Sequence, residues 1–168
     1  TLNATNKYDH IKGLVCIGAF DFQYANPQLI LRGNVDYGHL GDSMEITKAN
    51  RTTRKDSPSP KNSVAKAALA AGLEGGYDLF SASAKLRQLK QRLYLFGRYD
   101  YYDSMFQVVP SMTDEPEWER QKFTVGLNYY PIPEIVIKAE YSHRMLHKQF
   151  NDEPTVSLGI AYFGMFHF

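Results

Sequence analysis

Charged side chains recur at every second position in several stretches of this 168-residue chain, and this spacing limits the chemistry that they could do. Arg98 and Asp100 are two residues apart, and so are Lys138 and Glu140. Residues two apart in an extended strand point to the same face. Such charges could line a water-filled path for solutes, or they could pair with one another as structural ion pairs. Both interpretations stay open from the sequence alone.

Ten charged residues belong to the polar half of this alternation. We expect them to face a common interior, where they are candidates for solute selectivity: Arg32, Asp36, Glu74, Asp78, Arg92, Arg98, Asp100, Lys138, Glu140 and Arg144. Because the spacing is two, each candidate must be carried by a strand.

Catalytic and metal chemistry have weaker support in the sequence. His39 and His143 lie near Ser43 and Ser142, but no nucleophile, base and orienting residue share the spacing of a hydrolase site. The single Cys16 cannot form an internal disulfide, and no Cys/His cluster has metal-ligand spacing. We therefore expect no enzyme, no metal site and no cofactor.

The composition favours an all-β protein. The chain has 12 Tyr, 10 Phe and 12 Gly residues, and aromatic side chains suit the pleated surface of a sheet. The formal net charge of +1 gives no reason to expect a nucleic-acid partner. No stretch approaches the roughly 18 apolar residues that a membrane helix needs, which excludes a helical membrane protein. A transmembrane barrel remains compatible, because its strands alternate apolar and polar residues.

Seven segments alternate with a period of two and predict the strands of an antiparallel sheet. The last one, residues 155–168, sets large apolar and aromatic side chains against small or polar ones and runs to Phe168. A terminal strand of this kind is typical of the closing strand of a bacterial outer-membrane barrel. The other six strands are expected near residues 14–24, 29–39, 69–79, 92–103, 123–130 and 135–145.

The predicted connections differ in length at the two ends of the strands. Short turns are expected at residues 26–28, 84–90 and 131–133. Long loops are expected at about residues 47–64, 107–119 and 147–154. This difference is typical of outer-membrane barrels, which have tight periplasmic turns and longer external loops.

Aromatic residues of the apolar set fall near both ends of the predicted strands. This distribution predicts two membrane-interface girdles. One comprises Tyr24, Tyr77, Tyr129, Tyr162, Phe166 and Phe168 near the short turns, and the other comprises Tyr37, Tyr99, Tyr101 and Tyr141 towards the long loops.

An odd number of strands conflicts with a complete single-chain bacterial barrel, which normally has an even number. With seven strands, the first and the last would run parallel, so they could not close an antiparallel barrel together. We therefore expect the chain to be the C-terminal portion of a larger barrel. The alternative is an unrecognised eighth strand within residues 1–12.

Three segments resemble the last strands of the phosphate-selective porin family: residues 95–103, residues 124–133 with the letters TVGLNYYPIP, and residues 136–141. The resemblance covers roughly residues 91–168 and includes the aromatic terminus. It implies a large barrel, often trimeric, that passes small anions. The chain departs from that family because its expected lumen wall carries nearly equal numbers of bases and acids. The five bases among the candidates are accompanied by the acids Asp21, Asp36, Glu74, Asp78, Asp100 and Glu140. The sequence therefore does not support phosphate selectivity.

The sequence predicts one domain over residues 1–168, a transmembrane antiparallel up-and-down β-barrel or its C-terminal portion, in a bacterial outer membrane. We expect a porin-like channel for passive diffusion of small hydrophilic solutes. Its partners would be the lipid bilayer, lipopolysaccharide, other copies in a trimer or other outer-membrane proteins. The barrel-assembly machinery would recognise Tyr162, Phe166 and Phe168. Two alternatives remain, a non-conducting structural barrel that binds membrane proteins and a soluble barrel with its apolar face inside.

Overall fold

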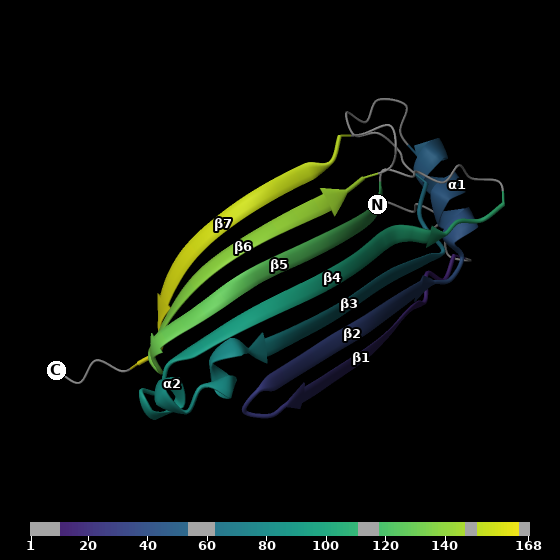
Figure 1. Cartoon of the computed structure of the whole chain (residues 1–168). Helices are drawn as coiled ribbons and strands as arrows, with labels where there is room; N and C mark the ends of the chain where they lie inside the picture. The colour runs from purple at the N-terminus through teal and green to yellow at the C-terminus, as the bar shows by residue number, and fades with distance from the viewer. Residues whose placement is uncertain (1–10, 54–62, 111–117, 147–150, 165–168) are drawn as a thin grey trace.

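The computed structural model describes residues 11–53, 63–110, 118–146 and 151–164. These residues form one antiparallel sheet of seven strands arranged in sequence order (Figure 1), which confirms the predicted all-β, up-and-down topology. The strands are β1 (Val15–Ala25), β2 (Leu29–Leu40), β3 (Ala67–Asp78), β4 (Arg92–Gln107), β5 (Glu119–Ile132), β6 (Ile135–Met145) and β7 (Glu153–Tyr162).

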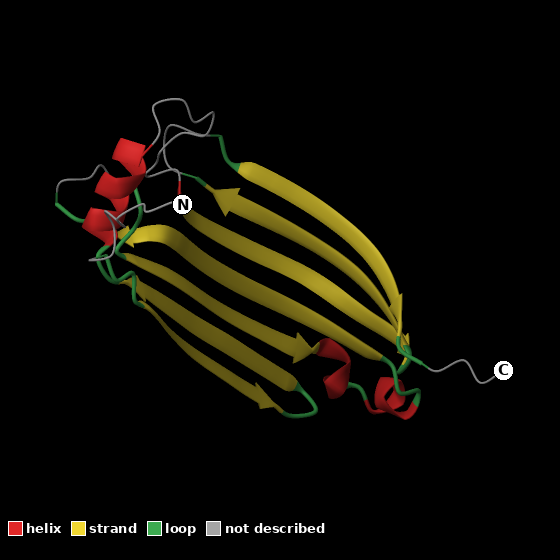
Figure 2. Ribbon diagram, turned by 180° about the vertical axis from the view of Figure 1, so that it is seen from behind, coloured by secondary structure: helices red, strands yellow, loops and turns green. Residues whose placement is uncertain are grey.

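The sheet is open, so the seven strands alone do not make the predicted barrel. β1 and β7 are its two edges (Figure 2), and within the described ranges neither pairs with another strand on its outer side. Because every neighbouring pair is antiparallel, β1 and β7 run in the same direction. Residues 11–14 are not part of a strand, and residues 1–10 lie outside the described ranges, so the eighth-strand alternative is not tested.

Two short turns join strands at one end of the sheet. In the β1–β2 turn, Asn26 Oδ1 accepts hydrogen bonds from the backbone N–H groups of Gln28 at 2.8 Å and Leu29 at 2.7 Å. This side-chain acceptor replaces a backbone carbonyl and stabilises the turn. Pro133 and Glu134 connect β5 to β6, so the turn lies later than the predicted 131–133: Pro131 and Ile132 belong to β5, where the pairing register shifts after Tyr129.

The β3–β4 connection at the same end differs from the prediction of a tight turn. It contains the 3-10 helix η1 (Leu79–Ala82) and the short helix α2 (Ala84–Gln88). Asp78 Oδ1 starts η1 by accepting from Phe80 N at 3.0 Å and also accepts from Leu93 N at 3.1 Å. The alternation of short and long connections is therefore less regular than the sequence suggested, because capping residues Asp78 and Ser83 favour helical turns here.

Helix α1 (Ser43–Thr53) occupies the beginning of the predicted loop at 47–64. The buried Thr47 anchors it, because its Oγ1 accepts from Val64 N at 2.9 Å. The other long loops are shorter than predicted at their ends, since β4 reaches Gln107 and β7 begins at Glu153. In the part of the chain that the structure describes, no helix has the length and apolar character needed to cross a membrane.

The predicted last strand also ends earlier than expected. β7 ends at Tyr162, and residues 163–164 are not in a strand. Phe166 and Phe168, which were predicted to belong to the strand and to a girdle, lie outside the described residues.

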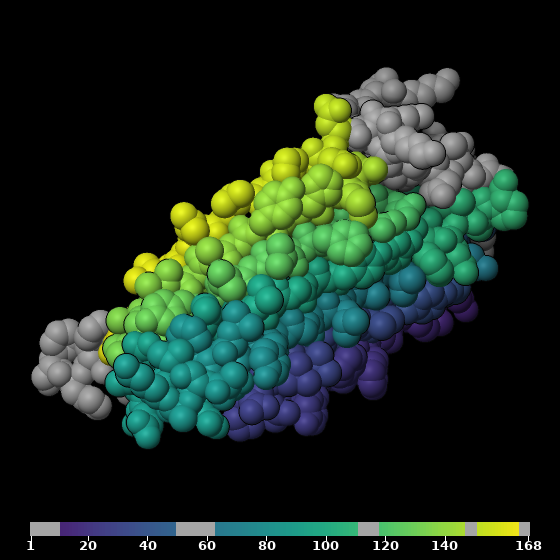
Figure 3. Space-filling view, in the orientation of Figure 1, coloured from purple at the N-terminus to yellow at the C-terminus, as the bar shows by residue number. Residues whose placement is uncertain are grey.

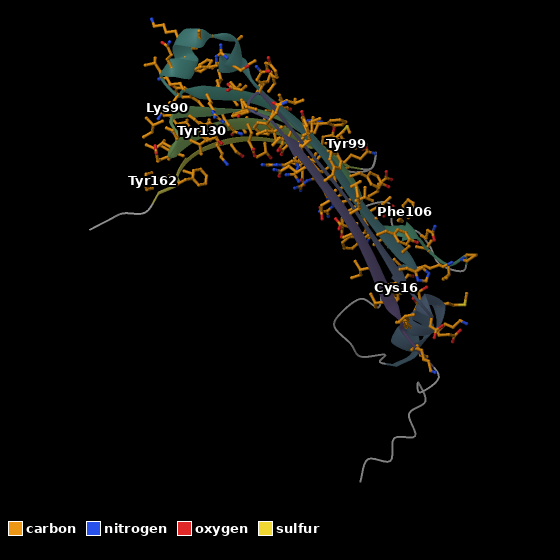
Figure 4. All side chains as sticks on the ribbon, turned by 90° about the horizontal axis from the view of Figure 1, so that it is seen from below. Cys16, Lys90, Tyr99, Phe106, Tyr130 and Tyr162 are labelled. Carbon is orange, nitrogen blue, oxygen red and sulfur yellow. The ribbon has the colours of Figure 1, made fainter. Side chains whose placement is uncertain are left out.

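The sheet is strongly curved, and its two faces differ in composition. Figure 4 shows the curvature, with Tyr99 on the convex side. On the convex face, Leu73 and Val125 are 57% and 49% exposed, whereas Thr124 and Ser142 on the concave face are only 8% and 5% exposed. Side chains of neighbouring strands form one continuous layer from β1 to β7 (Figure 3). The concave face therefore has closely packed positions on the middle strands, whereas side chains on its β1 edge, such as Ile17, remain exposed.

Candidate functional site

The strand register brings the predicted charged residues together on the concave face. Arg32 pairs with Glu74 across β2 and β3, and Glu74 pairs with Arg98 across β3 and β4. Directly paired residues share a face, and so does every second residue along a strand. By this rule the concave face carries all ten predicted residues: Arg32, Asp36, Glu74, Asp78, Arg92, Arg98, Asp100, Lys138, Glu140 and Arg144.

Half of these ten residues form ion pairs. Arg32 Nη1 lies 3.4 Å from Glu74 Oε1 across two strands. Arg98 Nη2 lies 2.8 Å from Asp100 Oδ1 on the same strand, as the spacing of two allowed. Arg144 Nη1 lies 2.7 Å from Glu153 Oε2. Pairing offsets these charges within the face and reduces the net electrostatic field at its surface.

Three other candidates have polar partners of a different kind. Asp78 is buried and caps η1 with its Oδ1. Asn34 Nδ2 donates to Asp36 Oδ2 at 3.1 Å, and Arg92 Nη1 donates to the Tyr94 hydroxyl at 3.3 Å. Asp78 therefore has a structural role that the sequence did not reveal.

Lys138 and Glu140 differ from Arg98 and Asp100 despite the same spacing. Among the described side chains, neither takes part in an ion pair. Both line a cavity of about 360 Å³ in the middle of the concave face, beside Phe96 and Lys122. These charges are available to a solute.

Sequence reasoning missed three charged residues of this face, Arg120, Lys122 and Glu153. Lys122 lies between Asp100 on β4 and Arg144 on β6, and Glu153 pairs with Arg144. Glu153 had been assigned to the loop at 147–154, whereas Arg120 and Lys122 fell between the predicted loop at 107–119 and the predicted strand at 123–130. Following the period of two backwards from Phe123 would have placed Lys122 on the polar set.

A glycine and a phenylalanine pack closely on the concave face. A Cβ atom at Gly126 would lie 2.7 Å from the Ala139 carbonyl oxygen and 2.7 Å from Cε1 and Cζ of the Phe96 ring. Phe96 is paired directly with Gly126 across β4 and β5, so its ring fills the space that a side chain would occupy.

The convex face carries the eight predicted girdle residues that lie within the described ranges. Tyr24, Tyr77 and Tyr129 lie near the turn end, and Tyr162 pairs with Ile135 beside the β5–β6 turn. The remaining four lie at varied distances along their strands: Tyr37, Tyr99, Tyr101 and Tyr141.

One cross-strand row limits how the girdles can be arranged. It connects Tyr24 through Leu31, Gly75, Gly97 and Val125 to Tyr141. Directly paired residues lie at the same level of the sheet. Tyr24 and Tyr141 can therefore belong to girdles at opposite membrane interfaces only if the strands are tilted, as barrel closure requires.

A polar chain of groups sits at the loop end of the convex face. The Tyr141 hydroxyl lies 3.3 Å from His143 Nδ1, and His143 Nε2 lies 3.0 Å from Asp152 Oδ2. Ser142, which the sequence offered as a neighbouring nucleophile, lies on the concave face because it alternates with His143. In the described ranges, no group of three His, Cys, Asp or Glu residues could hold a metal ion.

Comparisons with protein-family models, curated proteins and solved structures found no match to this chain. The resemblance of residues 91–168 to phosphate-selective porins therefore stays a prediction.

Proposed function

We propose that this chain supplies seven contiguous strands of a β-barrel that spans a bacterial outer membrane and lets small hydrophilic solutes diffuse through it. The observation that carries this proposal is the distribution of side chains over the curved sheet. Large apolar side chains are exposed on the convex face, and charged and polar ones cover the concave face. This is the arrangement of a sheet with lipid outside and water inside.

The dimensions of the strands support the same proposal. The shortest, β7, has 10 residues, and the longest, β4, has 16. A tilted strand needs about 9–11 residues to cross the hydrocarbon core. All seven strands are long enough to cross a bilayer.

The direction of curvature argues against the soluble alternative. A soluble barrel with a ligand cavity places its apolar side chains inside, on the concave side of the sheet. Here Leu73, Val125 and Ile137 are exposed on the convex side instead. An apolar surface of this extent requires a covering phase, and a membrane provides one.

The open edges determine how a barrel could be completed. Because β1 and β7 run in the same direction, an antiparallel closure needs an odd number of additional strands between them. A single additional strand would give eight strands, whose interior is filled by side chains. The proposed diffusion path therefore requires at least three further strands, contributed by another segment or chain.

The charges of the concave face suggest a path without strong ion selectivity. Arg32, Arg98 and Arg144 are each neutralised by a carboxylate within 4 Å. Sieving by width would then dominate discrimination among solutes. The same pairing is the observation that favours the second candidate, a narrow structural barrel whose interior is filled by its own ion pairs.

Two measurements test the proposal. The full chain, exported in a Gram-negative host, should be recovered from the outer-membrane fraction, and the barrel isolated together with the strands that complete it should give discrete conductance steps in planar bilayers. Lys122→Glu should shift the reversal potential in a salt gradient towards cation preference, because it replaces a base on the concave face. Lys66→Glu, outside the strands, is the matched control and should have no such effect.

The outcomes separate the two candidates. Outer-membrane recovery without conductance steps at any voltage would support the structural barrel and overturn the channel. Recovery as a monodisperse protein in detergent-free buffer would overturn both.

A further inference from the structure

A large cavity lies at the turn end of the sheet, between the η1–α2 connection and the concave face. Its volume is about 750 Å³. Figure 4 shows Lys90 and Tyr130, two of its lining residues, at the same end of the molecule. The cavity is separate from the ion pairs in the middle of the sheet. Of the ten charged residues predicted to face the interior, Asp78 and Arg92 line it.

Basic side chains dominate the charge around this cavity. Arg87, Lys90 and Arg92 line it with a single acid, Asp78, so three bases face one carboxylate. Asp78 is buried, and its Oδ1 already accepts two backbone hydrogen bonds. The three bases are exposed, and none of them takes part in an ion pair among the described residues.

Another part of the cavity lining is aromatic and apolar. The rings of Tyr94 and Tyr130 lie edge to face, with centroids 6.0 Å apart. Arg92 Nη1 donates to the Tyr94 hydroxyl, which holds the guanidinium beside this wall. Pro27, Ile30 and Pro133 add apolar surface. A ligand here would meet both positive charge and flat apolar groups.

The backbone at Lys90 is held in an unusual conformation. Lys90 has a φ of 56°, in the left-handed region that non-glycine residues rarely adopt. The preceding helix holds this turn, since Lys90 N donates to Arg87 O at 3.0 Å and Gln91 N donates to Leu86 O at 3.2 Å. These two hydrogen bonds form a Schellman motif, the usual way in which a helix ends on a left-handed residue. Here the conformation places a base at the cavity.

We propose that this cavity binds a small organic anion that combines a planar carboxylate with a ring. Guanidinium groups hold a carboxylate through paired hydrogen bonds, and the tyrosine rings offer a stacking surface for the ring. An inorganic anion would leave most of the cavity and the whole apolar wall unused. The inference rests on the cavity alone and does not depend on solute conduction.

Calorimetric titration of the purified full chain in detergent tests this proposal, with benzoate as the probe. Benzoate should bind saturably. Inorganic phosphate, which lacks the ring, and benzyl alcohol, which lacks the charge, should each bind at least about tenfold more weakly. If benzoate does not bind saturably at concentrations up to about 10 mM, which would reveal even a weak ligand, the proposal is overturned.

Variants locate the binding site. Arg87→Gln combined with Lys90→Asn should weaken benzoate binding at least about tenfold, because two charge-assisted contacts are lost. Asn tolerates the left-handed backbone at position 90. Lys85→Gln is the matched control, since Lys85 is on the same helix but does not line the cavity.

A second variant tests the aromatic wall without changing the net charge. Tyr130→Leu should weaken benzoate binding and leave phosphate binding unchanged. Equal affinities for benzoate and phosphate, or full benzoate affinity in the Arg87/Lys90 variant, would overturn the proposed site. A near-native circular dichroism spectrum confirms that each variant is folded.

Discussion

The concave and convex faces are built from alternate residues of the same strands, yet they satisfy their side chains in different ways. On the concave face, polar groups meet one another across strands, as Arg32 meets Glu74 and Arg144 meets Glu153. On the convex face, Leu73, Val125 and Ile137 remain exposed. The first face is completed by contacts within the chain, whereas the second needs an external apolar phase.

The same substitution should therefore change the free energy of unfolding differently on the two faces. A new charge on the convex face would have to enter the covering phase, whereas on the concave face it would join an existing network of charges. A new methyl group would meet open space at Gly97 on the convex face and packed atoms at Gly126 on the concave face.

The largest effect is expected from Leu158→Arg on the convex face of β7, where Leu158 is 81% exposed. An arginine facing lipid near the bilayer midplane costs about 2–4 kcal/mol. The neighbouring variant Ser157→Arg, on the concave face opposite Glu140, should cost much less. Urea unfolding of both variants in lipid vesicles measures the difference.

If lipid does not cover the convex face, this contrast disappears. Equal unfolding free energies for the Leu158 and Ser157 variants would contradict the membrane-spanning arrangement.

An intermediate effect is expected from Gly126→Ala, for which we predict a loss of about 1–3 kcal/mol in the free energy of unfolding. The added methyl group would meet the Ala139 carbonyl oxygen and the Phe96 ring. Gly97→Ala is the control, because a Cβ atom there meets nothing within 4 Å. Thermal or urea unfolding of the two variants gives the comparison, and similar losses would show that the concave face is not tightly packed at Gly126.

The smallest effect is expected from the Arg144–Glu153 ion pair. Both side chains are partly exposed, so a double-mutant cycle with Arg144→Gln and Glu153→Gln should give a coupling of only about 0.2–1 kcal/mol. The coupling should decrease with added salt. A salt-independent coupling above this range would mean that the pair is shielded from water.

Much of the fold could be predicted because strand periodicity is a local property. The alternation around Ile135–Met145 reproduced the bounds of β6, and the assignment of Arg98 and Asp100 to one face follows from spacing alone. Helices α1 and α2 were missed because short polar segments carry little periodic signal. The cap of the preceding 3-10 helix, Asp78, also contacts a backbone group 15 residues away, which local periodicity does not reveal.

The candidate cavity at the turn end was also beyond sequence reasoning. Arg87 and Lys90 lie in a segment predicted to be a tight turn, far from Tyr130 in sequence. Only the pairing of β4 with β5, which places Arg92 opposite Tyr130, brings the bases and the aromatic wall together.

The amino-acid sequence by itself determined the seven strands and divided their side chains into a polar and an apolar set, because a period of two needs only neighbouring residues. The tertiary structure decided which set is concave and which charges meet. Arg32 and Glu74 are 42 residues apart, so their contact depends on the register of β2 with β3. Register and curvature arise from packing across all strands at once, and this is why they decide where charge is paired and where it remains available to a ligand.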